Sequence, residues 1–277
     1  MLGLSVKSVL VIAIAVFCCS AAIATEISYF GYDDFGGTWC DAEKAPGNYE
    51  DDQLCWAAAA GNILVWTGWS TPVSTDTDEV FAYFQDHWTD DGSVPEYAWN
   101  WWFDGTNPNQ GVSGWSQVDV PGGGFWDPPY DLGDYYRRTW RDEDAMDAVY
   151  DDLHDGYGVT LGIYTTTGGG HAITAWGVKY DDVTGDVLGV YVTDSDDDKN
   201  DSTPEDELKY YAMSFDPGEG SDGQWFFQDF YGTSDVWYVG EVMSLDQSPV
   251  SVPEPATVAL MIAACSMTLA VVRKRNK

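Results

Sequence analysis

Residues 159–196 have the sequence VTLGIYTTTGGGHAITAWGVKYDDVTGDVLGVYVTDSD, in which runs rich in β-branched and aromatic residues alternate with glycine and aspartate. Three of these runs, 159–165, 172–180 and 187–193, are typical of β-strands. The acidic segment between the last two, 181–186, contains a glycine and predicts a hairpin turn. The strands on either side of this turn therefore pair antiparallel. The end of the last strand then lies beside the start of the one before it.

Helices are predicted before these strands and further strands after them. Acidic residues and an alanine run predict a helix over 51–66, and caps with apolar stripes predict helices over 74–88 and 142–154. Two more strand patterns follow, at 208–215 and 236–243. This order indicates an α+β fold, with N-terminal helices and a C-terminal antiparallel sheet.

Both ends of the chain are typical of processing signals. Residues 1–24 combine an early lysine, a short apolar run and a small-x-small cleavage site, which predicts a secretory signal peptide. Residues 252–277 contain Pro-Glu-Pro, a short apolar segment and a basic end, which indicates a membrane stop with its basic end in the cytoplasm. The segment between them, 25–251, is long enough for one large domain with a core.

The C-terminal segment 252–277 resembles the PEP-CTERM sorting tail in all three of its parts. The resemblance implies export from a Gram-negative-type bacterium and transient membrane anchoring of a precursor through this tail. It also implies removal of the tail by an exosortase-like processing enzyme. The mature protein is then expected at the cell surface or in the extracellular space.

One of the three histidines differs from the others in its context. His171 follows three glycines and opens a predicted strand, so that a rigidly held imidazole faces open space, as a general base requires. His87 and His154 fall near the ends of predicted helices and are expected at the surface. Asp194 ends the strand that pairs with that of His171, so we expect its carboxylate to orient the imidazole.

Cys55 is the candidate nucleophile. It falls in the first turn of the helix predicted over 51–66, where unpaired N–H groups and the helix dipole favour the thiolate over the thiol. Of the five cysteines in the chain, Cys40 and Cys55 belong to the predicted domain. A Cys40–Cys55 disulfide is the alternative, because an exported protein folds in an oxidising compartment.

Several motif blocks resemble the IdeS/Mac family, the streptococcal IgG-cleaving cysteine endopeptidases. They are DDQLC at 51–55 with AAAAGN at 57–62, His171 with the Trp-Gly pair at 176–177, and YVTDSD at 191–196. The resemblance implies a papain-like fold. It also implies hydrolysis of peptide bonds by a Cys-His-Asp triad, without a metal or another cofactor.

The catalytic positions of that family match Cys55 as nucleophile, His171 as base and Asp194 as the group that orients the base. A second family aspartate matches Asp196, and the family's oxyanion-hole lysine matches Lys44 at a spacing one residue longer. The specificity for IgG is not carried over, because it depends on remote binding surfaces and this chain is far more acidic. We expect an exported cysteine endopeptidase with a protein or peptide substrate.

The charge of the chain excludes some partners. Its formal net charge is −34 at pH 7, and five of its twelve basic residues lie in the two terminal segments. Such an acidic surface repels nucleic acid and anionic lipid. Nucleic acid is therefore not an expected partner.

Two binding functions remain open beside proteolysis. Asp194, Asp196, Asp198 and Glu205 follow the spacing of a calcium loop, although Lys199 stands where such loops need glycine. Five tryptophans of the predicted loop region would suit stacking on sugar rings: Trp99, Trp101, Trp102, Trp115 and Trp126. The alternative function is an acidic surface or matrix-associated protein that binds carbohydrate or calcium on an inactive protease-like scaffold.

Overall fold

The computed structural model describes residues 25–45, 47, 50–140, 143–197, 205–218 and 223–250 of the 277-residue chain. The predicted signal peptide, 1–24, and the predicted sorting tail, 252–277, lie outside the described residues. Among the described residues, no helix combines the length and the apolar composition needed to cross a membrane.

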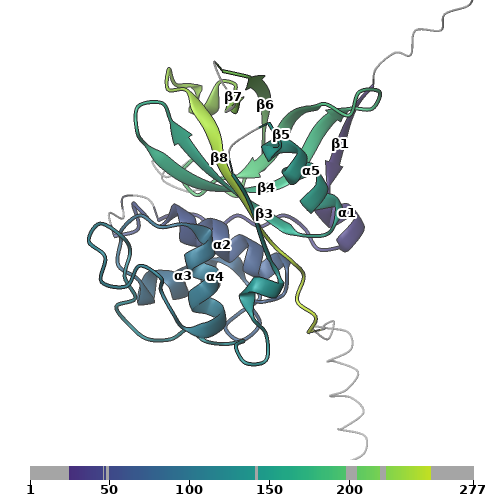
Figure 1. The fold of residues 1–277 in the computed structure, drawn as a ribbon. Helices are drawn as coiled ribbons and strands as arrows, with labels where there is room; N and C mark the ends of the chain where they lie inside the picture. The colour runs from purple at the N-terminus through teal and green to yellow at the C-terminus, as the bar shows by residue number, and fades with distance from the viewer. Residues whose placement is uncertain are drawn as a thin grey trace, which may run out of the picture.

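Six antiparallel strands close into a barrel (Figure 1). Their order around it is β4-β3-β8-β7-β6-β5, and β5 pairs back onto β4. Two short strands extend the sheet, β1 (Glu26–Phe30) on β4 and β2 (Tyr136–Trp140) on β8. The barrel strands are β3 (Gly158–Thr165), β4 (Gly170–Asp181), β5 (Val187–Thr193), β6 (Lys209–Asp216), β7 (Gln224–Phe227) and β8 (Trp237–Leu245).

The long strand β4 makes this closure possible. Its first half pairs with β3 from Gly170 to Ala175, and its second half pairs with β5 from Thr174 to Tyr180. After the part of β4 that pairs with β3, the residues from Gly177 to Asp181 pair with β1. A Cβ at Gly177 would approach the Phe30 ring to 2.4 Å. Only glycine allows β1 to lie this close to β4.

The helices lie in two places around the barrel (Figure 1). α2, α3 and α4 form a layer on one side, whereas α5 lies near β1 and α1. α2 contacts β3 and β4 as well as α3 and α4, and its residues from Trp56 to Leu64 are buried. The helices are α1 (Gly31–Phe35), α2 (Cys55–Trp66), α3 (Thr77–His87), α4 (Pro95–Asp104) and α5 (Ala145–His154), with 3-10 turns η1 (Leu132–Asp134) and η2 (Phe230–Gly232).

Alternation along β4 connects the barrel to the helical layer. Ala172 and Trp176 pack into the cluster of α2, α3 and α4, whereas Ile173 and Ala175 pack into the interior cluster of the barrel. Successive side chains of a strand point to opposite faces, so one strand serves both cores. This arrangement fixes α2 against the strand that begins with Gly170 and His171.

The predicted papain-like α+β fold, with N-terminal helices and a C-terminal antiparallel sheet, is wrong. The strands instead form a closed six-stranded barrel, and the longest helix among the described residues has only 12 residues. Three short strands, β1, β2 and β7, were not predicted, and they have five, five and four residues. Strands of this length show too little alternation to be recognised, and sequence patterns do not reveal the pairings of β6 with β5, of β7 with β6 and of β8 with β7 that close the barrel.

Candidate active site

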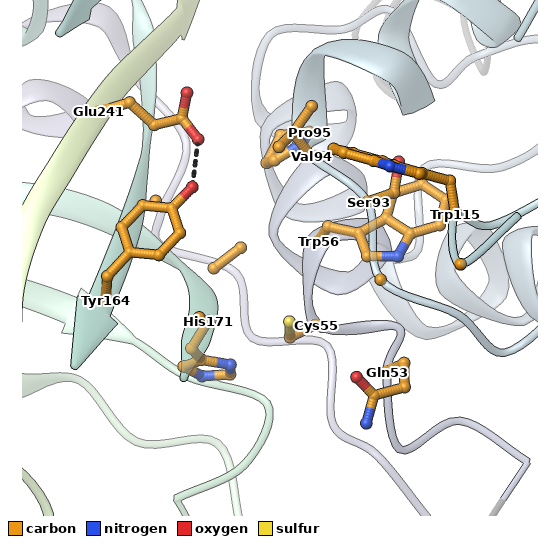
Figure 2. Close-up of a pocket in the computed structure, with 15 residues that line it drawn as sticks. Gln53, Cys55, Trp56, Ser93, Val94, Pro95, Trp115, Tyr164, His171 and Glu241 are labelled. Carbon is orange, nitrogen blue, oxygen red and sulfur yellow. Dashed lines mark hydrogen bonds between the residues drawn. The ribbon is translucent and has the colours of Figure 1, made fainter. Parts of the chain in front are cut away.

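Cys55 is the first residue of α2 and lies at the base of a cleft between the helical layer and the barrel (Figure 2). The helix therefore begins at the thiol itself, not at the predicted Asp51. Leu54, the residue before it, provides no side-chain cap. The N–H groups of Cys55 and Trp56 precede the first hydrogen bonds of the helix, which Ala57 and Ala58 donate to the Leu54 carbonyl, and together with the helix dipole they stabilise negative charge on the sulfur.

His171 and Asp194 are brought together by the β4–β5 pairing. Thr174 of β4 lies opposite Thr193 of β5, so the residue after Thr193 reaches the beginning of β4. His171 Nε2 and Asp194 Oδ1 are 2.6 Å apart, and the two side chains are 6% and 1% exposed. The predicted proximity of these two residues is confirmed.

The thiol and the imidazole shift each other's protonation. Burial by itself raises the pKa of Cys55, but the charge of His171, a hydrogen bond with it and the charge of Lys44 outweigh burial, so the pKa is lowered. Burial lowers the pKa of His171, but Asp194 and Cys55 outweigh it and hold the pKa well above its ordinary value. Both shifts favour a thiolate beside an imidazolium.

Asp194 remains ionised in this buried position. Burial raises its pKa, but attraction to His171 and hydrogen bonds from His171, from the Tyr231 hydroxyl and from the Asp196 N–H lower it overall. The Asp196 N–H donates to Asp194 Oδ1 at 3.0 Å. A carboxylate held by several donors is a fixed acceptor for the imidazole.

Lys44 lies beneath the site and is fully buried. Its ammonium contacts Asp196 Oδ1 at 2.7 Å and donates to the carbonyl of Asp52 at 3.0 Å. The other oxygen of Asp196 lies 3.7 Å from His171 Nδ1. The structure thus brings all five predicted site residues together, with Lys44 held by Asp196. Gln53, which was not predicted, is the polar side chain before Cys55 that lines the cleft.

Tyr231 is a further member of the cluster that the sequence analysis missed. Tyr231 belongs to η2, which connects β7 to β8. Its hydroxyl donates to Asp194 Oδ2 at 2.5 Å. Tyr231 and Asp229 have positive φ values of 55°, and such strained backbone is concentrated at functional sites. No motif marks this position, since the contact arises only when the barrel closes.

Asn62 connects the helix of Cys55 to the two strands behind it. Its side-chain amide donates to the hydroxyl of Thr174 at 3.0 Å and of Thr193 at 3.4 Å, and its oxygen accepts from the N–H of Ala42 at 3.0 Å. This buried side chain fixes α2 relative to β4 and β5. It thereby sets the position of the thiol relative to the imidazole.

The cleft above Cys55 has a volume of about 300 Å³. Val94, Pro95 and Trp115 form its helical wall, and Tyr164 and Glu241 form its barrel wall (Figure 2). A second hollow of about 680 Å³ shares His171 with the first and is also lined by Asp196, Tyr231 and Trp237. His171 therefore stands between two hollows, both open to solvent.

The alternatives from the sequence fare differently. Cys40 and Cys55 are free thiols in the structure. Trp99, Trp101 and Trp102 are at most 1% exposed, so the predicted sugar platform is wrong for these three. Asp198 and its neighbours up to residue 204 lie outside the described residues. Among the described residues, no group of three or more His, Cys, Asp or Glu side chains is placed to hold a metal ion.

No protein-family model matches the chain, and no curated protein matches its sequence.

Proposed function

We propose that the protein is a cysteine endopeptidase in which Cys55 is the nucleophile, His171 the acid and base, and Asp194 the group that orients His171. The observation that supports this most strongly is the buried Asp194 carboxylate 2.6 Å from the His171 imidazole, whose charge and hydrogen bond with Cys55 in turn lower the pKa of the Cys55 thiol. Each partner has the role that nucleophilic catalysis requires. The motif resemblance to the IdeS/Mac endopeptidases supports the same reaction, although their papain-like fold is not shared.

The proposed reaction has two stages. The Cys55 thiolate attacks the carbonyl carbon of the scissile peptide bond, and the C–N bond breaks as the His171 imidazolium gives its proton to the leaving amine. His171, now neutral, then takes a proton from water, whose oxygen attacks the thioester. The C–S bond breaks, the carboxylic acid leaves, and the thiolate and imidazolium are restored.

The negative oxygen of each tetrahedral intermediate needs donors beside Cys55. The N–H of Cys55 belongs to the first turn of α2, and the carboxamide of Gln53 lines the same cleft. We assign these two groups to the oxyanion. Lys44, whose ammonium already binds Asp196 and the Asp52 carbonyl, supports the site through its charge and lowers the pKa of Cys55.

Hollows on both sides of His171 favour a polymeric substrate over a small molecule. A peptide chain can pass over Cys55 with side chains in the 300 Å³ cleft on one side and the 680 Å³ hollow on the other. The 1–24 and 252–277 segments support action outside the cell, with a precursor that is first anchored in a membrane and then released by an exosortase-like enzyme.

Alkylation offers a direct test with an internal control. Burial raises the pKa of the Cys40 thiol, whereas that of Cys55 is lowered, so iodoacetamide at pH 6 should modify Cys55 many times faster than Cys40. Mass spectrometry of the tryptic peptides measures both rates in one sample. Equal rates at the two cysteines would contradict the proposal.

Digestion of a mixed peptide library tests the activity itself. The purified protein should cleave internal peptide bonds, and Cys55→Ala, prepared in the same way, should not. Cys40→Ala is the matched control and should retain the cleavage pattern. Cleavage that persists in Cys55→Ala, or a wild-type protein that cleaves none of the peptides, would refute the function.

A further inference from the structure

The far end of the cleft contains a single acidic side chain, that of Glu241. Among the described residues that line the cleft, Glu241 is the only carboxylate. It comes from β8, and its side chain is 2% exposed. It packs over Gly162 of β3, where a Cβ would approach Glu241 Cγ to 2.6 Å. The missing side chain at Gly162 is thus what lets the carboxylate reach the cleft wall.

Among the residues that the structure describes, the ion pairs of Glu241 do not balance its charge. Arg138 contacts the Glu241 carboxylate and also binds Glu96 Oε2 at 2.6 Å. Two carboxylates therefore share one guanidinium, which leaves one negative charge in a largely buried group. Tyr164 adds a neutral hydrogen bond to Glu241 Oε1 at 2.9 Å. A carboxylate accepts about four hydrogen bonds, so Glu241 retains capacity for a further donor.

The two walls of the cleft suit different parts of one long side chain. Figure 2 shows Glu241 and Tyr164 across the cleft from Val94 and Pro95, with Cys55 and His171 at its base. Val94, Pro95 and Ala172 offer apolar surface to methylene groups, and Glu241 offers a carboxylate to the end of the chain. A volume of about 300 Å³ is at the lower limit for ligand pockets and is enough for one large side chain.

We propose that this cleft is a specificity site for a lysine or arginine side chain of the substrate, whose charged end binds Glu241. The inference rests on the proposed endopeptidase function and adds to it a class of substrate. The incoming cation balances the charge that Arg138 leaves uncompensated between Glu241 and Glu96. The protein as a whole also favours basic substrates, because its net charge of −34 attracts cationic chains and speeds their association.

Matched peptides test the inference. A fluorogenic series places lysine, arginine, norleucine or glutamate at each position around one cleavage site, and norleucine keeps the methylenes of lysine without its charge. For wild-type protein, we expect lysine or arginine at one position to raise kcat/KM at least about tenfold over norleucine, as a charged hydrogen bond allows. Equal rates for lysine and norleucine at every position would overturn the inference.

Two variants identify the group responsible. Glu241→Gln keeps the shape of the side chain, and the ratio of lysine to norleucine should fall close to one. Glu96 does not line the cleft, and Glu96→Gln leaves the Arg138 guanidinium entirely to Glu241. The ratio of lysine to norleucine should therefore fall in this variant as well. A ratio that stays at its wild-type value in Glu96→Gln would refute the role of Glu241, even if Glu241→Gln were too poorly folded to assay.

The outcome separates this inference from the function on which it rests. If Cys55→Ala abolishes cleavage and wild-type protein prefers an apolar residue at every position, only the basic specificity is wrong. If wild-type protein cleaves none of the peptides, the endopeptidase function fails and the inference fails with it.

Discussion

Removal of one hydroxyl, in Tyr231→Phe, tests whether the site extends beyond the three residues of the triad. The Tyr231 hydroxyl donates to Asp194 Oδ2 at 2.5 Å, and the opposite oxygen of Asp194 holds His171. Phenylalanine keeps the ring that packs against Phe230 and Trp237. The substitution therefore removes a hydrogen bond and leaves the packing in place.

The magnitude follows from the charge on the acceptor. A hydrogen bond to a charged group contributes about 1.5–3 kcal/mol, which corresponds to about 10- to 150-fold in rate if the whole bond is lost in the transition state. Part of the bond also stabilises the resting enzyme, and that part does not affect kcat. We therefore expect kcat to fall about tenfold, with little change in KM.

The pH profile gives a second readout that packing alone would not change. The hydrogen bond from Tyr231 helps to hold the pKa of Asp194 low, so its loss raises that pKa and moves the acid limb of kcat to higher pH. The assay is cleavage of one good peptide between pH 4 and pH 9. Tyr211→Phe is the control, because Tyr211 lines the same hollow, whereas the hydroxyl bound to Asp194 is that of Tyr231. Unchanged kcat and an unchanged profile in Tyr231→Phe, beside an inactive Asp194→Asn, would refute this reasoning.

Two further predictions concern the same cluster. In Asp194→Asn, His171 loses the charge that most raises its pKa. The alkaline limb of the pH–activity profile, where the imidazolium loses its proton, should therefore move to lower pH, and turnover should fall at least about a hundredfold. An alkaline limb that stays in place would argue against the pairing of His171 with Asp194. Lys44→Met should raise the pKa of Cys55, measured as the pH dependence of iodoacetamide alkylation, whereas Gln53→Ala should lower kcat about tenfold or more and leave that pKa unchanged. If Lys44→Met lowers kcat without changing the pKa of Cys55, and Gln53→Ala leaves kcat unchanged, Lys44 and not Gln53 binds the oxyanion.

Local sequence patterns predicted several elements well. The strand expected at 187–193 is β5 with the same bounds, and the helix expected at 142–154 corresponds to α5, Ala145–His154. α4 was missed because its tryptophans lie in a region rich in glycine and proline. Its limits were nevertheless present in the sequence, since Pro95 occupies the first turn and Gly105 ends the helix in the left-handed conformation.

The candidate site was predictable where it depends on one hairpin. The pairing of β4 with β5 follows from strand runs and a turn between neighbouring segments, so the contact of His171 with Asp194 could be deduced. Tyr231 and Glu241 could not be found in this way. Tyr231 lies 37 residues along the chain from its partner Asp194, and Glu241 lies 103 residues from its partner Arg138. No repeating pattern connects residues so far apart.

Sequence by itself therefore determined which groups are the candidates for catalysis: a cysteine at a helix start, a histidine after three glycines and an aspartate at a strand end. These depend on periodicity, capping and turns, which act between near neighbours in the chain. Only the tertiary structure decided that the strands close into a barrel, that Lys44 is held by Asp196, and that Tyr231 and Glu241 face the site. Those arrangements result from burial and pairing between distant segments, whose free energy depends on the whole fold and not on any local pattern.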